Sequence, residues 1–277
     1  MSKRNNWENK QSARERLRAE RERQAKKDRT RRQLIVGGAV VAVLAVGAGI
    51  VVAVSQLGKD GKSGLNASWE AASKKELVKP ANTGGDNGTE ILIGKKDAKH
   101  TLDLYQDMRC PICSVFEQSV GDTIDKDVKD GKYKVSYHVA TFLDRNFGGS
   151  GSKNALSALG AALNVSPEAF SAYNKALYSK ANHPNETKDD YAKDDVLLKV
   201  ANEVPALKGN AEFEKNVKDG TFDKWALTVS DEFDKAKDVT GTPTLKMNGK
   251  KLTAEDGKNV PITPDQYTKA IDAALKS

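Results

Sequence analysis

Residues 101–130 have the sequence TLDLYQDMRCPICSVFEQSVGDTIDKDVKD, which contains the only two cysteines of the chain. The first seven residues alternate between polar and apolar side chains, a pattern that predicts a β-strand. After Cys110-Pro111-Ile112-Cys113, apolar residues recur at helical spacing, namely Val115, Phe116, Val120, Ile124 and Val128. Residues 134–140, KVSYHVA, alternate again. The stretch therefore predicts a strand, a cysteine pair, a helix and a second strand, the order expected at the start of an α/β domain.

Further strands are expected on both sides of this segment. EILI at 90–93 precedes it, and TPTLKM at 242–247 is followed by Asn248-Gly249, the strongest local signal for a two-residue hairpin turn. A closing helix is predicted from Pro264 to Lys276, with Thr263 as its N-cap. The domain is therefore expected to end on a hairpin and a helix.

The middle of the chain, roughly residues 149–235, shows no strand pattern. Helices are predicted at residues 152–163, 167–180, 188–203, 211–218 and 222–236. We interpret this region as an all-helical insertion between two parts of one α/β domain.

The cysteine pair is predicted to be redox-active. A structural zinc site needs four ligands, and the three histidines show no paired ligand spacing, so no metal and no cofactor is expected. A purely structural disulfide across two residues would close a very short loop and constrain the unfolded chain little. Redox chemistry is therefore favoured over both structural roles.

The expected helix gives the two cysteines different properties. If the helix begins at Pro111, Cys110 lies at its N-terminal end, where free N–H groups and the macrodipole favour a thiolate. Proline suits the first helical position because its missing N–H would be unpaired there. Cys110 is therefore expected to be exposed and reactive, and Cys113, one turn later, to be less exposed and to act as the resolving thiol.

A second motif, Gly241-Thr242-Pro243-Thr244, lies more than a hundred residues after the cysteines. The simplest interpretation is a turn proline. Thioredoxin-like proteins, however, place a loop with a cis-proline at this point of the sequence, facing the reactive cysteines, and proline is nearly the only residue that tolerates a cis bond.

Together these motifs give a specific resemblance. Residues 89–148 and 236–277 resemble the DsbA-like thiol–disulfide oxidoreductases of the thioredoxin superfamily, of the membrane-tethered kind found in Gram-positive bacteria. The resemblance rests on LYQDMRCPIC with the following Phe116-Glu117, on TFLDR at 141–145 and on VTGTPT at 239–244. It implies an α/β thioredoxin-like fold with a helical insertion, Cys110 as the nucleophile and Cys113 as the resolving cysteine. It also implies that Thr242 and a cis-Pro243 bind the substrate backbone.

Two departures from this family concern the redox strength. Many relatives carry an acid on the strand before the cysteines, where this chain has Leu104, and Asp103 is expected on the opposite face of the strand. The best-known relatives have a histidine where this chain has Ile112. We therefore expect the Pro111-Ile112 dipeptide to give Cys110 a lowered pKa, though less lowered than in the strongest oxidants.

Residues 34–54, LIVGGAVVAVLAVGAGIVVAV, contain no charged residue. As a helix this run would be ~30 Å long, the thickness of the hydrocarbon core of a bilayer. The sequence therefore predicts one N-terminal transmembrane helix. A cleaved export signal, loosely of the twin-arginine type, is the alternative, but the apolar run is longer than the ~7–15 residues usual for such signals.

The charge of the chain supports this topology. Residues 1–33 contain 13 Lys/Arg and 5 Asp/Glu, whereas the other 244 residues contain 32 and 33, so the net charge of +7 comes from the tail. A near-neutral body argues against nucleic-acid binding. Positive residues remain on the cytoplasmic side, so residues 1–33 are predicted to be cytoplasmic. Residues 55–88 are then a flexible linker, and residues 89–277 form the extracytoplasmic domain.

The function predicted from the sequence is a single-pass, membrane-anchored oxidoreductase that forms or exchanges disulfides in exported proteins. Its substrates would be exported protein thiols, and a quinone-linked membrane oxidase would re-oxidise it. Two alternatives stay open. One is a reductase or isomerase, and the other is a non-catalytic binding or chaperone domain in which the CxxC pair is a static disulfide.

Overall fold

A five-stranded mixed sheet forms the centre of the structure, a computed structural model that describes residues 62–276. The strand order is β1-β3-β2-β4-β5. The strands are β1 (Ile91–Ile93), β2 (Thr101–Asp107), β3 (Lys134–Ala140), β4 (Thr244–Met247) and β5 (Lys250–Lys251). Only β2 and β3 are parallel, because the helix α3 (Pro111–Asp130) connects them as a crossover. The other three pairings are antiparallel.

The predicted hairpin joins β4 to β5. Asn248 and Gly249 have φ angles of 50° and 82°, the left-handed backbone that a tight turn of this kind requires. The α/β prediction for both ends of the domain is therefore confirmed.

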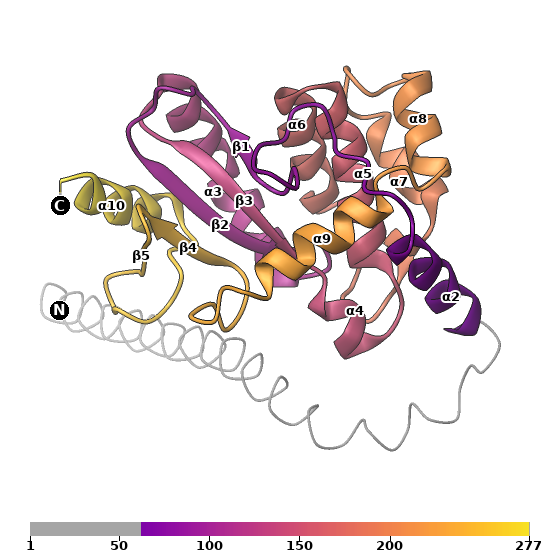
Figure 1. The fold of residues 1–277 in the computed structure, drawn as a ribbon. Helices are drawn as coiled ribbons and strands as arrows, with labels where there is room; N and C mark the ends of the chain where they lie inside the picture. The colour runs from indigo at the N-terminus through magenta and orange to yellow at the C-terminus, as the bar shows by residue number, and fades with distance from the viewer. Residues whose placement is uncertain (1–61, 277) are drawn as a thin grey trace, which may run out of the picture. The chain divides into compact units, whose positions relative to one another are not determined.

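Helices cover both faces of the sheet (Figure 1). On one face α3 lies beside α10 (Pro264–Leu275), where the rings of Phe116 and Tyr267 are 6.3 Å apart. On the other face Tyr105 of β2 contacts Phe233 of α9 (Asp223–Phe233), with ring centroids 5.8 Å apart. Neighbouring residues of one strand point to opposite faces, so Leu104 is buried on the α3 side while Tyr105 faces α9.

The region between β3 and β4 is helical, as predicted, and lies beside the sheet in Figure 1. Its helices are α4 (Phe142–Phe147), α5 (Gly151–Val165), α6 (Pro167–Tyr178), a 3-10 turn (Asp190–Ala192), α7 (Asp194–Ala201), α8 (Ala211–Lys218) and α9. The helix expected at 188–203 begins only at Asp194. The Asp189 carboxylate instead accepts hydrogen bonds from the backbone of Ser150 and Gly151, a distant contact that no local pattern reveals.

The larger core cluster runs from the sheet into the helical region. A second, small cluster contains Tyr105, Ala140 and Phe233. In α3 the buried residues include Phe116, Val120 and Ile124, as the helical spacing predicted. Val115 differs, because 48% of it is exposed to solvent. The helix ends at Gly131, whose φ of 78° forms a left-handed cap.

Residues 62–88 differ from the flexible linker that the sequence predicted. They include the helix α2 (Lys62–Ser73), whose Ala72 is buried. The backbone N–H of Ala81 donates to the Asn164 side chain over 2.9 Å, and the Trp225 indole donates to the Gly88 carbonyl over 2.5 Å. This part of the predicted linker therefore packs against the helical region.

The predicted tail 1–33, the predicted span 34–54 and the first residues of the linker lie outside the described residues. Among residues 62–276, no helix has the length and apolar character needed to cross a membrane.

Candidate active site

Cys110 and Cys113 lie at the start of α3. Cys110 is the N-cap, Pro111 is the first helical residue, and the Cys110 N–H donates to the Asp107 carbonyl over 2.9 Å. The Cys110 sulfur accepts a hydrogen bond of 3.4 Å from the backbone N–H of Cys113. Both cysteines are free thiols in this structure. The helix terminus thus directs a backbone donor at the Cys110 sulfur, as the sequence predicted.

The loop before β4 completes the site. The Thr242–Pro243 peptide bond is cis, and the Cys110 thiol donates to the Thr242 carbonyl over 3.4 Å. The hydroxyl of Thr242 is buried and makes no hydrogen bond within residues 62–276. Four of the residues predicted from two distant motifs, Cys110, Cys113, Thr242 and Pro243, therefore meet at one place.

The two thiols differ in their acidity. Hydrogen bonding from the Cys113 side chain lowers the pKa of Cys110, helped by Thr242 and the Cys113 N–H and opposed by burial. Burial raises the pKa of Cys113 well above its usual range, and the neighbouring Cys110 raises it further. When one of the two thiols ionises, the negative charge therefore resides on Cys110, while Cys113 holds its proton.

Both cysteines are less accessible than the sequence suggested. Cys110 is only 6% exposed, compared with 2% for Cys113. Cys110 is the more exposed of the two cysteines, as expected. It is nevertheless buried and not exposed as predicted, because the Thr242–Pro243 loop lies against it.

Pro111 and Ile112 lie at the surface beside the cysteines. Ile112 is 48% exposed, and its hydrocarbon side chain offers no hydrogen-bond donor to the Cys110 sulfur. The groups that lower the pKa of Cys110 are therefore Cys113 and Thr242, and Ile112 is not among them. The redox-tuning role of the dipeptide stays a prediction.

Asp107, at the end of β2, is a buried acid that the sequence did not single out. Its carboxylate accepts hydrogen bonds from the Ser152 hydroxyl (2.6 Å) and from the backbone N–H groups of Arg109 and Leu143. Burial nevertheless raises its pKa to about 6, and its negative charge raises the pKa of Cys110. Asp103, the acid next to Leu104 in the sequence, pairs with His138 over 2.9 Å.

Glu117 is a second buried acid, one helical turn after Cys113 and on the same side of α3. It makes no hydrogen bond to the part of the chain that the structure describes. Burial raises its pKa to about 7, and the Asp125 charge adds to this effect while Lys175 opposes it. The stretch VFEQ at 115–118 gave no sign of this burial, because a glutamate at that point of a helix can be either buried or exposed.

Arg109, directly before Cys110, is fully buried and connects the site to the helical region. Its guanidinium pairs with Asp144 at 2.9 Å and with Asp189 at 3.3 Å. It also donates to the carbonyls of Gly148 and Glu186. These bonds fix the turn between β2 and α3, and with it the position of Cys110.

Comparisons with known proteins agree with this geometry. The model of a family described as "Thioredoxin" matches residues 86–273. The curated protein "Disulfide bond formation protein D" of Bacillus subtilis is 27% identical over 160 residues, which cover 57% of this chain and 68% of that protein.

Two solved structures are similar in fold. BdbD of Bacillus subtilis has 23% identity and a TM-score of 0.55, covering 72% of this chain and 100% of that one. DsbA of Mycobacterium tuberculosis also has 23% identity and a TM-score of 0.55, covering 68% and 93%. The chain belongs to the thioredoxin family, and its fold is that of the DsbA-like thiol–disulfide oxidoreductases.

Proposed function

We propose that this protein forms or exchanges disulfide bonds in exported proteins through Cys110 and Cys113. Its relationship to disulfide bond formation protein D supports thiol–disulfide oxidoreductase activity in general. The observation that carries the proposal is the pair of thiols with opposite pKa shifts beside the cis-proline loop. A static disulfide has no need of such a difference in acidity.

The site supports oxidation of a client in two steps. A client thiolate attacks the Cys110 sulfur of the Cys110–Cys113 disulfide, which breaks this bond and forms a mixed disulfide between the client and Cys110. Cys113 leaves as a thiolate and takes up a proton, because its pKa is high. A second client thiolate then attacks the client sulfur of the mixed disulfide. Cys110 leaves as a stabilised thiolate, and the client carries the new disulfide.

Thr242 and Pro243 are proposed to hold the client backbone beside Cys110. The Thr242 carbonyl accepts from the Cys110 thiol before ionisation. A hydroxyl can rotate, so the unpaired Thr242 hydroxyl is able to donate to the sulfur once it carries a negative charge. The loop would then serve both the client and the leaving thiolate.

The location of the enzyme is also a proposal. The uncharged run 34–54 and the basic residues before it support a single membrane anchor with a cytoplasmic N-terminus and an extracytoplasmic catalytic domain. Each client disulfide leaves Cys110 and Cys113 reduced by two electrons. Repeated turnover therefore requires an oxidant, for which a quinone-linked membrane oxidase is the proposed partner.

Trapping experiments test the roles of the two cysteines. Cys113→Ser should accumulate mixed disulfides with client proteins, because Cys110 can still attack a client disulfide while the enzyme's own resolving thiol is absent. Cys110→Ser should accumulate none. Non-reducing gels of cell extracts measure both. Equal trapping by the two variants would contradict the assignment.

A second measurement separates the alternatives. An enzyme should catalyse insulin reduction or the refolding of a reduced substrate, whereas a binding or chaperone domain with a static disulfide should do neither. The reduction potential of the Cys110–Cys113 pair then separates an oxidase from a reductase or isomerase.

A further inference from the structure

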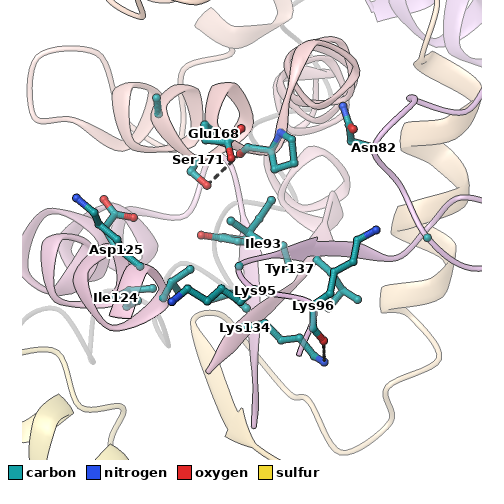
Figure 2. A pocket seen from close by; sticks show the side chains of 18 of the residues that line it. Asn82, Ile93, Lys95, Lys96, Ile124, Asp125, Lys134, Tyr137, Glu168 and Ser171 are labelled. Carbon is teal, nitrogen blue, oxygen red and sulfur yellow. Dashed lines mark hydrogen bonds between the residues drawn. The ribbon is translucent and has the colours of Figure 1, made fainter. Parts of the chain in front are cut away.

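A groove of about 1160 Å³ lies between β1, the C-terminal half of α3 and the N-terminal half of α6. Figure 2 shows Ile93 and Tyr137 in its middle, with Glu168 and Ser171 of α6 on one side and lysines on the other. Ile124 lies on the α3 side of the groove, beside Asp125. Ile124 is 14 residues from Cys110 along α3, a distance of ~21 Å. The groove is therefore separate from the cysteine site.

The rim of the groove carries unbalanced positive charge. Lys95, Lys96, Lys129 and Lys134 line it, and none of them forms an ion pair with a carboxylate of residues 62–276. Lys134 donates only to the Lys96 carbonyl, over 3.3 Å. Lys175 is neutralised by Asp122 and Asp125, so Glu168 is the carboxylate left to oppose the four lysines. The groove thus favours an anionic occupant.

The edge of the sheet opens into the same groove. Glu90 uses its backbone N–H and C=O to pair with Gly84, on the side away from β3. Because these groups alternate in direction along a strand, the N–H and C=O of Leu92 point to the same open side. The pairing goes no further, since Ala81 turns away to bond with Asn164. Leu92 therefore presents unpaired backbone groups beside the lysines.

Tyr137 adds a polar group to the apolar floor. Tyr137 as a whole is 6% exposed and lines the groove. Its hydroxyl makes no hydrogen bond to the described part of the chain. This hydroxyl is therefore free to bond with a ligand in the groove.

We propose that this groove binds an extended, acidic segment of a partner polypeptide. The segment adds to the open edge of β1 at Leu92, as peptides add to exposed sheet edges elsewhere. Alternate side chains then face the floor at Ile124 and Tyr137, and acidic side chains between them meet the lysines. A lipid headgroup would satisfy the lysines but would leave the backbone of Leu92 unpaired, so the open edge favours a polypeptide.

The test uses the full chain and a fluorescent, cysteine-free peptide of alternating glutamate and valine. Fluorescence anisotropy should show binding of this peptide and no binding of its lysine–valine counterpart. The double variant Lys95→Glu/Lys96→Glu should weaken binding at least about tenfold, because it reverses charges at the contact. The matched control Lys250→Glu/Lys251→Glu changes an adjacent exposed pair on β5, at the opposite edge, and should bind within about twofold of wild type.

Leu92→Pro removes one outward N–H and should also weaken binding, provided that its circular dichroism matches the wild type. Insulin reduction should be unchanged in Lys95→Glu/Lys96→Glu, so failure of the groove and failure of the cysteine chemistry are distinguishable. No peptide binding, or equal loss in both lysine double variants, would overturn the proposal. A lipid would be favoured instead if the wild type binds phosphatidylglycerol vesicles but not the peptide, and if Lys95→Glu/Lys96→Glu loses the vesicle binding.

Discussion

At the scale of single residues, the chemistry depends on how one sulfur is stabilised as an anion. Cys110 receives this stabilisation from Cys113 and Thr242, and Asp107 and burial act against it. None of these groups is the residue at position 112. The side chain of Ile112 is half exposed beside the sulfur, so a donor placed there would add to the existing ones.

Ile112→His should therefore make the pair more oxidising. A stabilised thiolate favours the reduced form, so the reduction potential should rise by about 30 mV or more, equivalent to a tenfold change in equilibrium constant. The wild-type potential should lie between the ~−270 mV of thioredoxin and the ~−120 mV of DsbA. A glutathione equilibrium titration measures the potential, and the thiolate absorbance against pH measures the pKa of Cys110. Ile112→Leu is the control and should leave both values unchanged, whereas a lower potential in Ile112→His would contradict the argument.

Glu117 should make the stability of the protein depend on pH. Its pKa rises on folding from its ordinary 4.5 to about 7, so the folded protein binds this proton more tightly than the unfolded chain. The free energy of unfolding should therefore fall by up to about 3 kcal/mol as the pH rises from 4.5 to 7. Glu117→Gln should lose this part of the pH dependence in urea denaturation series. If the free energy of unfolding changes with pH in the same way in the variant and the wild type, Glu117 ionises freely in the folded state.

At the scale of elements, local sequence patterns predicted the strands, helices and turns that depend on neighbouring residues. The strand at 101–107, the helix after Pro111 and the Asn248-Gly249 turn each depend on residues close in sequence, and each is present. The predicted approach of Thr242 to Cys110 came from the family resemblance instead. No local pattern joins positions 132 residues apart.

The parts that sequence missed depend on distant contacts. Residues 80–88 contain turn-forming residues and were expected to lack order, yet Asn164 and Trp225 of the helical region bond to them. Asp107 and Glu117 look like ordinary polar positions, and only the burial supplied by other elements raises their pKa values. The break before α7 likewise depends on Asp189 reaching Ser150.

Gly160 of α5 tests the packing of α5 against α9. A Cβ at this position would lie 2.7 Å from Cζ3 of Trp225 and 3.1 Å from Cβ of Phe222. Gly160→Ala should therefore destabilise the domain by about 1–2 kcal/mol, because overpacking costs about 1–3 kcal/mol and alanine regains up to about 1 in helix propensity. Thermal or urea unfolding measures this loss. In a Trp225→Phe background, where the clashing ring atoms are absent, Gly160→Ala should be neutral or stabilising, and an unchanged loss there would refute the packing argument.

At the scale of the whole molecule, the thiol chemistry and the proposed location depend on each other. A disulfide-forming pair is useful only where disulfides persist, outside the reducing cytosol. Within residues 62–276 no helix has the length and apolar character to span a membrane, and the proposed location requires an attachment to one. The uncharged run 34–54 is the candidate for that attachment.

The topology can be measured with single cysteines, because the chain has no cysteine other than 110 and 113. In a Cys110→Ser/Cys113→Ser background, Lys250→Cys places a thiol on the exposed strand β5, and Ser12→Cys places one in the basic tail. A small membrane-impermeant maleimide should label the first in intact protoplasts and the second only after detergent is added, because positive residues hold the tail in the cytoplasm. Retention of the labelled chain in carbonate-washed membranes would identify an uncleaved anchor, whereas its release would identify a cleaved signal. Labelling of position 250 only after permeabilisation would place the cysteine pair in a reducing compartment and contradict a role in exported disulfides.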